Sequence, residues 1–248
     1  MKITIIGYGR MGHVIERIAQ ERGDTVVCRI DKDNIGDFES QEFLTSDVAI
    51  EFTTPATGRA NVERCLRAGV PVVSGTTGWN ADLGAMQELC RNLGGSMMWS
   101  SNYSIGVNIF MAINRRLAAI MNAFSQYSPR LTETHHIHKL DHPSGTAVTL
   151  AEEIVEANER ITGWAEPEEG KLKVGQGLLP VFHIRSGEVP GIHTITWDSA
   201  ADDITITHSA KNRDGFAIGA VLAAHWLVKN PGVHTMREML HDISPEIN

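Results

Sequence analysis

One stretch of the sequence combines side chains that can bind an anion with side chains that can move a proton. Within a few positions it contains His135, His136, His138 and Lys139. Pro143-Ser144-Gly145-Thr146 follows, directly before an apolar pattern typical of an amphipathic helix that Ser144 or Thr146 would cap. The first N–H groups of a helix lack internal partners and carry the positive end of its dipole, so they suit a carboxylate or a phosphate. The alternative is a polar strand–loop–helix junction with solvated histidines.

The apolar pattern predicts that residues 130–139 form the strand before this helix. On a regular strand alternate residues share a face, so His135 and Lys139 could share one pocket. His136 would reach that pocket only if the strand bends or the ligand wraps around its edge, and His138 is the best candidate for a structural histidine. Adjacent histidines on a strand diverge and no cysteine accompanies them, so we expect no metal site.

A glycine-rich turn near the N-terminus has the spacing of a dinucleotide-binding site. The apolar run 2–6 leads into Gly7-Tyr8-Gly9-Arg10-Met11-Gly12, and a helical pattern follows. In this GxGxxG spacing the first glycine allows a tight turn, and the second lets the backbone approach a pyrophosphate. The third allows close packing of the helix on the strand.

The second apolar run, 25–30, ends at Asp31, where an acid can hold the ribose hydroxyls of the adenosine. An acid at this point favours NAD over NADP. The adjacent Lys32 could accept a 2′-phosphate and so bind the cofactor, or it could be a solvated surface charge. NADH, NADPH or both therefore remain candidate cofactors.

Three later apolar runs predict further strands of the same parallel sheet, and polar residues follow each of them. Thr53 follows residues 48–52, and Gly75-Thr76-Thr77-Gly78 follows residues 70–74. Ser101-Asn102-Tyr103-Ser104 follows residues 96–100. Ligands bind at the carboxyl ends of parallel strands, so these segments are expected to line the nucleotide site.

The strand–helix alternation stops near Ser104, and residues 105–124 have helical periodicity. From Arg130 the pattern is rich in strands, with one intervening helix and a polar segment, 167–177, expected to be a mobile loop. Residues 214–228 are helical again, and Thr235 begins a capping-box motif.

We therefore predict an α/β protein with an N-terminal Rossmann-type parallel sheet and a second α+β domain with a mixed sheet. The dinucleotide-binding domain is expected to be discontinuous, over residues 1–104 and 213–248. Residues 105–212 would form the substrate-binding and oligomerisation domain.

The composition and charge of the chain limit the classes of partner that the protein can bind. The net charge of −8 over 248 residues argues against nucleic acid. The longest apolar run, 216–228, is too short to span a membrane. Three cysteines without CxxC spacing suggest neither disulfides nor zinc, and no signal peptide precedes the first strand, so we expect a cytoplasmic protein.

Together these motifs resemble those of the 4-hydroxy-tetrahydrodipicolinate reductase (dihydrodipicolinate reductase) family, over essentially the whole chain. The most specific match is His135-His136-x-His138-Lys139-x-Asp141-x-Pro143-Ser144-Gly145-Thr146-Ala147. The glycine turns and the segments 102–108, 185–193 and 208–213 also fit the family pattern. The segment between Asp31 and Val48 is shorter than in many relatives, which leaves the cofactor preference open.

The resemblance implies an oxidoreductase that uses NADH or NADPH to reduce a small cyclic imine dicarboxylate, 4-hydroxy-tetrahydrodipicolinate, in the diaminopimelate route to lysine. It implies His135 and Lys139 as the catalytic pair that handles the proton, without deciding between them. It implies substrate binding by His136, Lys139, Ser144, Gly145 and Thr146. It implies cofactor contacts from Gly7, Gly9, Arg10, Met11, Gly12, Asp31, Phe52, Thr53, Gly75, Thr77, Ser101, Asn102, Tyr103 and Arg213. It also implies a homotetramer joined through the sheet of the second domain.

Two rival hypotheses stay open. A nucleotide-sensing protein that binds NAD(P) without catalysis would need the glycine turn and Asp31, but not the histidine–lysine cluster. Another Rossmann reductase, such as an amino-acid or imine dehydrogenase, would share the layout but not the whole pattern of the second half.

Overall fold

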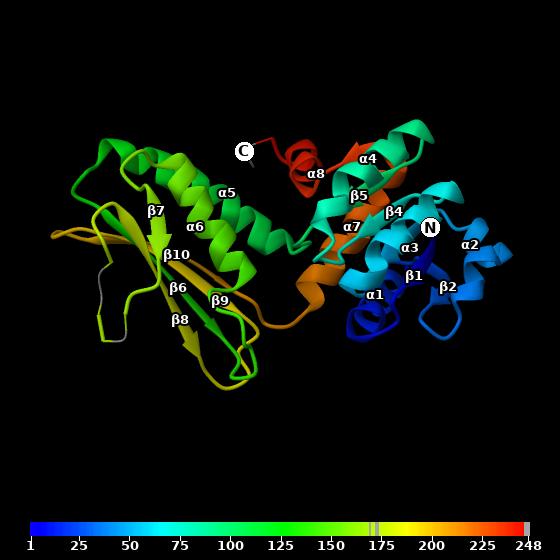
Figure 1. Ribbon diagram of the computed structural model, residues 1–248, viewed down its shortest axis with the longest axis horizontal. Helices are drawn as coiled ribbons and strands as arrows, with labels where there is room; N and C mark the ends of the chain where they lie inside the picture. Colours follow the sequence, from blue (N-terminus) through cyan, green and yellow to red (C-terminus); the bar gives the residue numbers. More distant parts are fainter. Residues whose placement is uncertain (169, 172–173, 246–248) are drawn as a thin grey trace. The chain divides into compact units, whose positions relative to one another are not determined.

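The computed structural model describes residues 1–168, 170–171 and 174–245 (Figure 1). Its contacts divide the chain into two units. The first comprises Met1–Ile105 and resumes at Arg213, and the second contains the described residues between Gly106 and Asn212. None of the described helices is long and apolar enough to cross a membrane.

In the first unit, parallel strands form one sheet in the order β11-β5-β4-β3-β1-β2, which confirms the predicted parallel sheet. The strands are β1 (Lys2–Ile6), β2 (Thr25–Ile30), β3 (Val48–Glu51), β4 (Val72–Ser74), β5 (Met97–Trp99) and β11 (Val233–His234). The chain passes from β1 to β2 on one side and returns to β3 on the other. The strand order therefore reverses between β1 and β3, which is where parallel sheets of this kind bind ligands.

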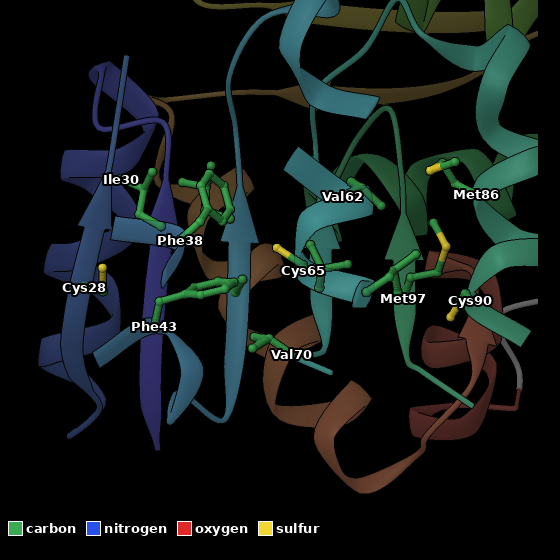
Figure 2. Close-up of a cluster of buried hydrophobic side chains, with 14 of the residues drawn as sticks. Cys28, Ile30, Phe38, Phe43, Val62, Cys65, Val70, Met86, Cys90 and Met97 are labelled. Atoms are coloured by element: carbon green, nitrogen blue, oxygen red, sulfur yellow. The ribbon is translucent and has the colours of Figure 1, made fainter. Parts of the chain in front are cut away.

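Helices cover both faces of this sheet, which explains why β1 and β3 read as nearly continuous apolar runs. The helices are α1 (Arg10–Glu21), α2 (Gln41–Leu44), α3 (Pro55–Arg67), α4 (Leu83–Asn92), α7 (Asp214–Lys229) and α8 (Met236–Ile243), with short 3-10 segments at Ile35–Glu39 and Asn80–Asp82. On one face Cys65 of α3, Cys90 of α4 and Phe43 of α2 pack with Ile30 and Met97 of the strands (Figure 2). Helix α7 contacts β3, β4, β5 and α1.

A buried carboxylate fastens the returning helix α7 to the start of the chain. Asp24 lies between α1 and β2, and its Oδ1 accepts a hydrogen bond from the ammonium group of Met1 at 3.1 Å. Its Oδ2 lies 2.8 Å from Nε2 of His225 in α7. Gly219 of α7 packs so closely that a Cβ there would stand 1.7 Å from the carbonyl oxygen of Tyr103. These contacts explain how a late segment completes the first unit.

In the second unit a mixed sheet has the order β10-β9-β6-β8-β7, as predicted for an α+β domain. Its strands are β6 (Ser128–His135), β7 (Gly163–Ala165), β8 (Leu178–Arg185), β9 (Ile192–Asp198) and β10 (Asp203–Ser209). Strand β6 is antiparallel to β9 and parallel to β8. Helices α5 (Ile105–Ile120), followed by the 3-10 segment Met121–Ala123, and α6 (Gly145–Ala157) lie on one face of the sheet (Figure 1). Leu150 and Ile154 of α6 pack there on Leu131, Ile195 and Trp197.

Strand β6 ends at His135, so the expected strand over residues 130–139 is wrong at its end. Both neighbouring strands stop there: β8 ends at Arg185, and Gly187 turns the chain with φ +48°, while β9 begins only at Ile192. Without partners on either side, residues after His135 turn, and the N–H of Lys139 donates to the carbonyl of His136 at 3.1 Å. His135 and Lys139 therefore do not share a strand face, contrary to the prediction.

Two short strands, β7 and β11, were not expected. The predicted loop 167–177 lies partly outside the described residues. The predicted capping box at Thr235 is confirmed: its hydroxyl accepts from the N–H of Glu238, whose carboxylate accepts from the N–H of Thr235.

Candidate functional site

In the first unit a pocket lies at the carboxyl ends of β1, β3 and β4, beside the point where the strand order reverses. It is lined by Gly9, Arg10, Met11, Phe52, Thr53, Pro55, Gly75, Thr76 and Thr77. All but Pro55 and Thr76 are residues that the sequence predicts as cofactor contacts. Three segments far apart in the sequence thus meet at one end of the sheet.

The glycines in and beside this pocket have two different structural roles. Gly7 has φ +92°, and a Cβ there would stand 2.0 Å from the carbonyl oxygen of Phe52. A Cβ at Gly12 would stand 2.4 Å from the oxygen of Gly7, and one at Gly75 2.3 Å from the ring of Phe52. These three glycines allow close packing. Gly9 differs, because among the described residues nothing lies within 4 Å of a Cβ placed there. This open side stands at the N-cap of α1, where a pyrophosphate fits.

Asp31 stands at the end of β2, next to the glycine turn. Its Oδ2 accepts from the N–H of Tyr8 at 2.9 Å and its Oδ1 accepts from the N–H of Lys32 at 2.7 Å. Asp31 and Lys32 are both exposed and do not line the pocket described above. The carboxylate is thus held beside the turn with its outer side accessible, as a ribose-binding acid would need.

A second carboxylate, Glu51, was missed by the sequence reasoning. It ends β3, is fully buried, and accepts from Ser74 Oγ at 2.6 Å and Thr76 Oγ1 at 2.8 Å, as well as from Thr53 Oγ1. The N–H of Thr53 in turn donates to Thr76 Oγ1 at 2.7 Å. Glu51 therefore fixes the two strand ends that form the pocket wall. A lone acid inside an otherwise apolar strand was the available signal.

The other expected cofactor residues lie nearby in the first unit but do not line the pocket. Tyr103 is buried, and its hydroxyl donates to the carbonyls of Ser74 at 3.1 Å and Met98 at 3.0 Å, so the side chain supports the strand ends. Burial raises the pKa of this phenol well above its usual value. Asn102 Oδ1 accepts from the N–H of Ser104 at 2.9 Å. The remaining two, Ser101 and Arg213, are exposed.

In the second unit, a row of ionisable side chains crosses the helix-covered face of the sheet. Sheet register places His208 of β10, His193 of β9, Glu133 of β6 and His183 of β8 opposite one another. The centre of this row is Glu133, whose side chain is fully buried. A charge in that position must be compensated by its neighbours.

Glu133 is compensated by one group from its own strand and by groups from two other segments. Its Oε1 accepts from the N–H of Ser144 at 3.1 Å and from Arg185 Nη2 at 3.2 Å, and its Oε2 lies 3.2 Å from His135 Nδ1. Burial raises the pKa of this carboxyl, but the contacts with His135, Ser144 and Arg185 outweigh burial and lower the pKa to about 2. Glu133 is thus an anion that orients His135.

His193 is held in its neutral form. Its side chain is buried, its Nε2 lies 3.2 Å from Ser144 Oγ, and its ring meets the ring of His135 edge-on at 5.1 Å. Burial, reinforced by His135, lowers the pKa of His193 to about 4. Sequence reasoning assigned His193 no role, although it belongs to the family pattern.

Lys139 stands in the turn after β6, and Arg185 holds that turn. Arg185 Nε donates to the carbonyl of Lys139 at 3.1 Å, and its Nη2 donates to the carbonyl of Asp141 at 2.7 Å as well as to Glu133. Lys139 Nζ donates to both oxygens of Asp141, at 2.9 and 2.7 Å, and this contact lowers the pKa of the Asp141 carboxyl. Arg185 therefore connects the backbone of Lys139 with Glu133, whereas the sequence predicted a link between Lys139 and His135 through a shared strand face.

Helix α6 begins as predicted, with Ser144 rather than Thr146 as its cap. Ser144 Oγ accepts from the N–H of Ala147 at 3.2 Å. No acceptor faces the N–H groups of Gly145 and Thr146 among the described residues, and a Cβ at Gly145 would meet nothing within 4 Å. This end of the helix is open to an anion.

The two remaining histidines of the motif, His136 and His138, differ in how far they are buried. His136 is half-buried, and its Nδ1 is buried without a partner among the residues that the structure describes. The side chain of His138 is 65% exposed and lies 2.9 Å from Glu188. The expectation that His138 is structural is therefore wrong, because the chain leaves the sheet before reaching it.

The expectation of no metal site considered only residues 135–138. Two other groups bring nitrogen and oxygen ligand atoms within 4.8 Å of one another: Glu133 with His135 and His193, and Glu166 with His142 and His183. The first belongs to the site just described. The second lies next to it, because His183 is opposite Glu133 in the sheet.

A parallel sheet with a glycine turn, an acid at the end of the second strand and a pocket at the reversal of strand order defines a dinucleotide-binding protein of the Rossmann class. Comparison with known families shows which family of this class the chain belongs to. Residues 1–103 match the description "Dihydrodipicolinate reductase, N-terminus", and residues 106–240 match "Dihydrodipicolinate reductase, C-terminus". The chain belongs to the dihydrodipicolinate reductase family.

Relatives of similar length support this assignment. The chain is 41% identical over 247 residues to the 4-hydroxy-tetrahydrodipicolinate reductase of Christiangramia forsetii, covering 98% of this chain and 99% of the relative. It is 35% identical to the enzyme of the same name from Archaeoglobus fulgidus, covering 97% and 100%. Among solved structures, a dipicolinate-bound dihydrodipicolinate reductase from Paenisporosarcina sp. TG-14 has the same fold, with a TM-score of 0.73 at 21% identity over 95% of this chain and 97% of that one.

Proposed function

We propose that the protein is an NAD(P)H-dependent 4-hydroxy-tetrahydrodipicolinate reductase, which forms tetrahydrodipicolinate in the diaminopimelate route to lysine. The observation that carries this proposal is the family match over both halves of the chain, together with relatives of that name that align over almost their whole length. Both rivals are weaker, since neither accounts for the second half.

The first unit would hold the cofactor. Gly7, Gly9, Arg10, Met11 and Gly12 would surround the pyrophosphate, with Asp31 and Lys32 at the adenosine ribose. The remaining contacts would come from the ends of β3, β4 and β5 and from the start of α7: Phe52, Thr53, Gly75, Thr77, Ser101, Asn102, Tyr103 and Arg213. When bound, the dinucleotide supplies the hydride. The open side of Gly9 at the N-cap of α1 supports this placement.

The second unit would hold the substrate and supply the proton. The N–H groups of Gly145 and Thr146, with Ser144, Lys139 and His136, would bind the carboxylates. The substrate would first lose water to give dihydrodipicolinate, to which the hydride adds. Hydride addition leaves negative charge on the ring, and Lys139 or His135 would neutralise it by donating a proton. Support comes from the first N–H groups of α6, which have no acceptor among the residues that the structure describes, and from Glu133, which lies 3.2 Å from His135.

Two further proposals concern the oligomeric state and the cellular location of the protein. We propose a homotetramer joined through the face of the β6–β10 sheet that the described helices leave uncovered, and a cytoplasmic enzyme. Three free buried cysteines fit a reducing compartment.

One assay tests the proposal. Oxidation of NADH and of NADPH is followed at the nicotinamide absorbance with freshly prepared 4-hydroxy-tetrahydrodipicolinate. Turnover with this substrate and none with amino or keto acids is the expected result. Binding of NADH without turnover would favour a sensing protein, and turnover of an amino acid would favour another Rossmann reductase.

A further inference from the structure

A second cluster of ligating side chains lies on the second unit beside Glu133, because His183 is opposite Glu133 in the sheet, but it shares no residue with the Glu133 group. His142 precedes the capping loop of α6, Glu166 directly follows β7, and His183 stands on β8. His142 Nδ1 lies 3.0 and 3.2 Å from the two oxygens of Glu166, and His183 Nδ1 lies 2.6 Å from Oε1. Two imidazole nitrogens therefore converge on one carboxylate.

The two imidazole rings also lie against each other. The rings of His142 and His183 stack with centroids 4.1 Å apart and planes inclined by 21°. In this arrangement the Nδ1 atoms of both rings face the carboxylate of Glu166. Imidazole nitrogens are common ligands of metal ions, so the three side chains present a ligand set at one point.

We propose that His142, Glu166 and His183 form a binding site for a divalent transition-metal ion of the zinc class. The three ligand atoms lie within 4.8 Å of one another. Ligands bound tetrahedrally at about 2.0–2.2 Å stand roughly 3.3 Å apart. The nitrogen–oxygen distances of 3.0 and 2.6 Å therefore need to lengthen by only a few tenths of an ångström to admit an ion. Two nitrogens and one oxygen select zinc, cobalt, nickel or copper over magnesium or calcium, which take oxygen ligands.

The surroundings also suit a metal ion. The side chains of His142, Glu166 and His183 are 49%, 29% and 37% exposed, so water can complete the coordination. Each ligand comes from a different segment, and the pairing of β7 with β8 brings two of those segments together. A bound ion would fasten the loop before Ser144 to this edge of the sheet, and so stabilise the N-terminal end of α6.

Metal titration of the untagged chain, stripped with EDTA and dialysed, tests the site. Zn²⁺ binding is measured by calorimetry, and Co²⁺ binding by its visible absorption, which reports nitrogen and oxygen ligands directly. We expect one ion per chain. His142→Gln, His183→Gln and Glu166→Gln should each weaken binding at least about tenfold, because each removes one of three ligands. All three positions are partly exposed, so the variants should fold, and far-UV circular dichroism checks this.

Two controls make the result specific. His138→Gln removes another exposed histidine that faces a carboxylate, Glu188, and should leave the affinity within about twofold. His193→Gln disrupts the buried Glu133 group and should also leave zinc affinity unchanged. No binding by the unaltered chain would overturn the proposal, and so would affinity that depends on His193 but not on His142.

Discussion

At the residue scale, the buried carboxylate of Glu133 links the groups to which we assign the chemistry. It contacts His135, the N–H of Ser144 and Arg185, and Arg185 in turn holds the backbone of Lys139. One buried anion thus positions the histidine, the helix end and, through Arg185, the lysine. The sequence motif contains His135, Lys139 and Ser144, but its spacing does not reveal that Arg185 connects Lys139 with Glu133.

The first prediction concerns stability in acid. His193 has its pKa lowered from 6.5 to about 4, so between these values the unfolded chain binds a proton that the folded chain does not. Its contribution to stability is therefore present above about pH 6.5 and is lost as the pH falls towards 4, by about 3 kcal/mol in all. In urea titrations from pH 7 to 4, His193→Gln should lose less stability than the unaltered chain by roughly this amount. Parallel pH profiles would refute the neutral, buried state of His193.

The second prediction concerns the proton. Lys139→Met should lower kcat by about 10²–10⁴, the usual contribution of a positioned acid or base. NADH affinity, measured by fluorescence, should stay the same because the proposed cofactor residues belong to the first unit. If His135 and Lys139 act together, the variant lacking both should show a fall in kcat much smaller than the product of the falls in the two single variants. Multiplicative losses would mean that the two groups act independently.

The third prediction concerns the cofactor. Asp31 is held beside the glycine turn by the N–H of Tyr8. We expect NADH to be used at least as well as NADPH, and Asp31→Ala to lower the NADH/NADPH ratio of kcat/KM by roughly tenfold or more. A hydrogen bond to a charged group contributes about 1.5–3 kcal/mol, which corresponds to that factor. Lys32→Ala is the companion variant: it should raise the ratio if the lysine binds a 2′-phosphate. If Asp31→Ala leaves the NADH/NADPH ratio unchanged, Asp31 does not contact the ribose.

At the scale of the elements, local signals located most of the helices and strands. The glycine turn, the apolar runs and the capping box predicted β1, α1, β3 and α8 because their causes lie within a few residues. The end of β6 could not be predicted, because it depends on where β8 and β9 stop. Short strands β7 and β11 carry too few residues for a periodic pattern. Glu51 and Arg185 acquire their roles only through contacts between distant segments.

The fourth prediction concerns the N-terminal end of α6. Pyridine-2,6-dicarboxylate has carboxylates on both sides of its ring nitrogen and accepts no hydride readily, so it should inhibit competitively against the imine substrate. Gly145→Pro removes one N–H at the first helical position, and Ser144 already has the extended conformation, ψ 154°, that a following proline requires. This variant should bind the diacid at least about tenfold more weakly, since a charge-assisted hydrogen bond contributes about 1.5–3 kcal/mol.

Gly145→Ala is the matched control for this experiment. It keeps the N–H, and its methyl group enters space where nothing lies within 4 Å, so it should bind the diacid nearly as well as the unaltered chain. Pyridine-2-carboxylate, with one carboxylate, should be the weaker inhibitor. Equal effects of alanine and proline would exclude the N–H group as the ligand.

At the scale of the whole molecule, the two faces of the mixed sheet differ in a way that points to self-association. One face packs on α5 and α6. The opposite face carries Ile184, which is 47% exposed, next to Thr134 of β6. Further across the sheet it carries Thr194 and Thr207, whose hydroxyls lie 3.1 Å apart. β-branched side chains on an uncovered sheet form a flat surface with little charge, which is typical of an interface between subunits.

The last prediction tests this face. Four chains of 27.2 kDa give about 109 kDa, which light scattering coupled to gel filtration should measure for the unaltered protein. Ile184→Asp would bury a charge in each interface and should shift the mass to a dimer or monomer, since an unpaired buried charge costs several kcal/mol. Leu44→Asp makes the same kind of change at a residue of the first unit that is 43% exposed, and should leave the mass at the tetramer value. A tetramer that survives Ile184→Asp would show that the subunits meet through another surface, and a monomeric unaltered chain would exclude the assembly altogether.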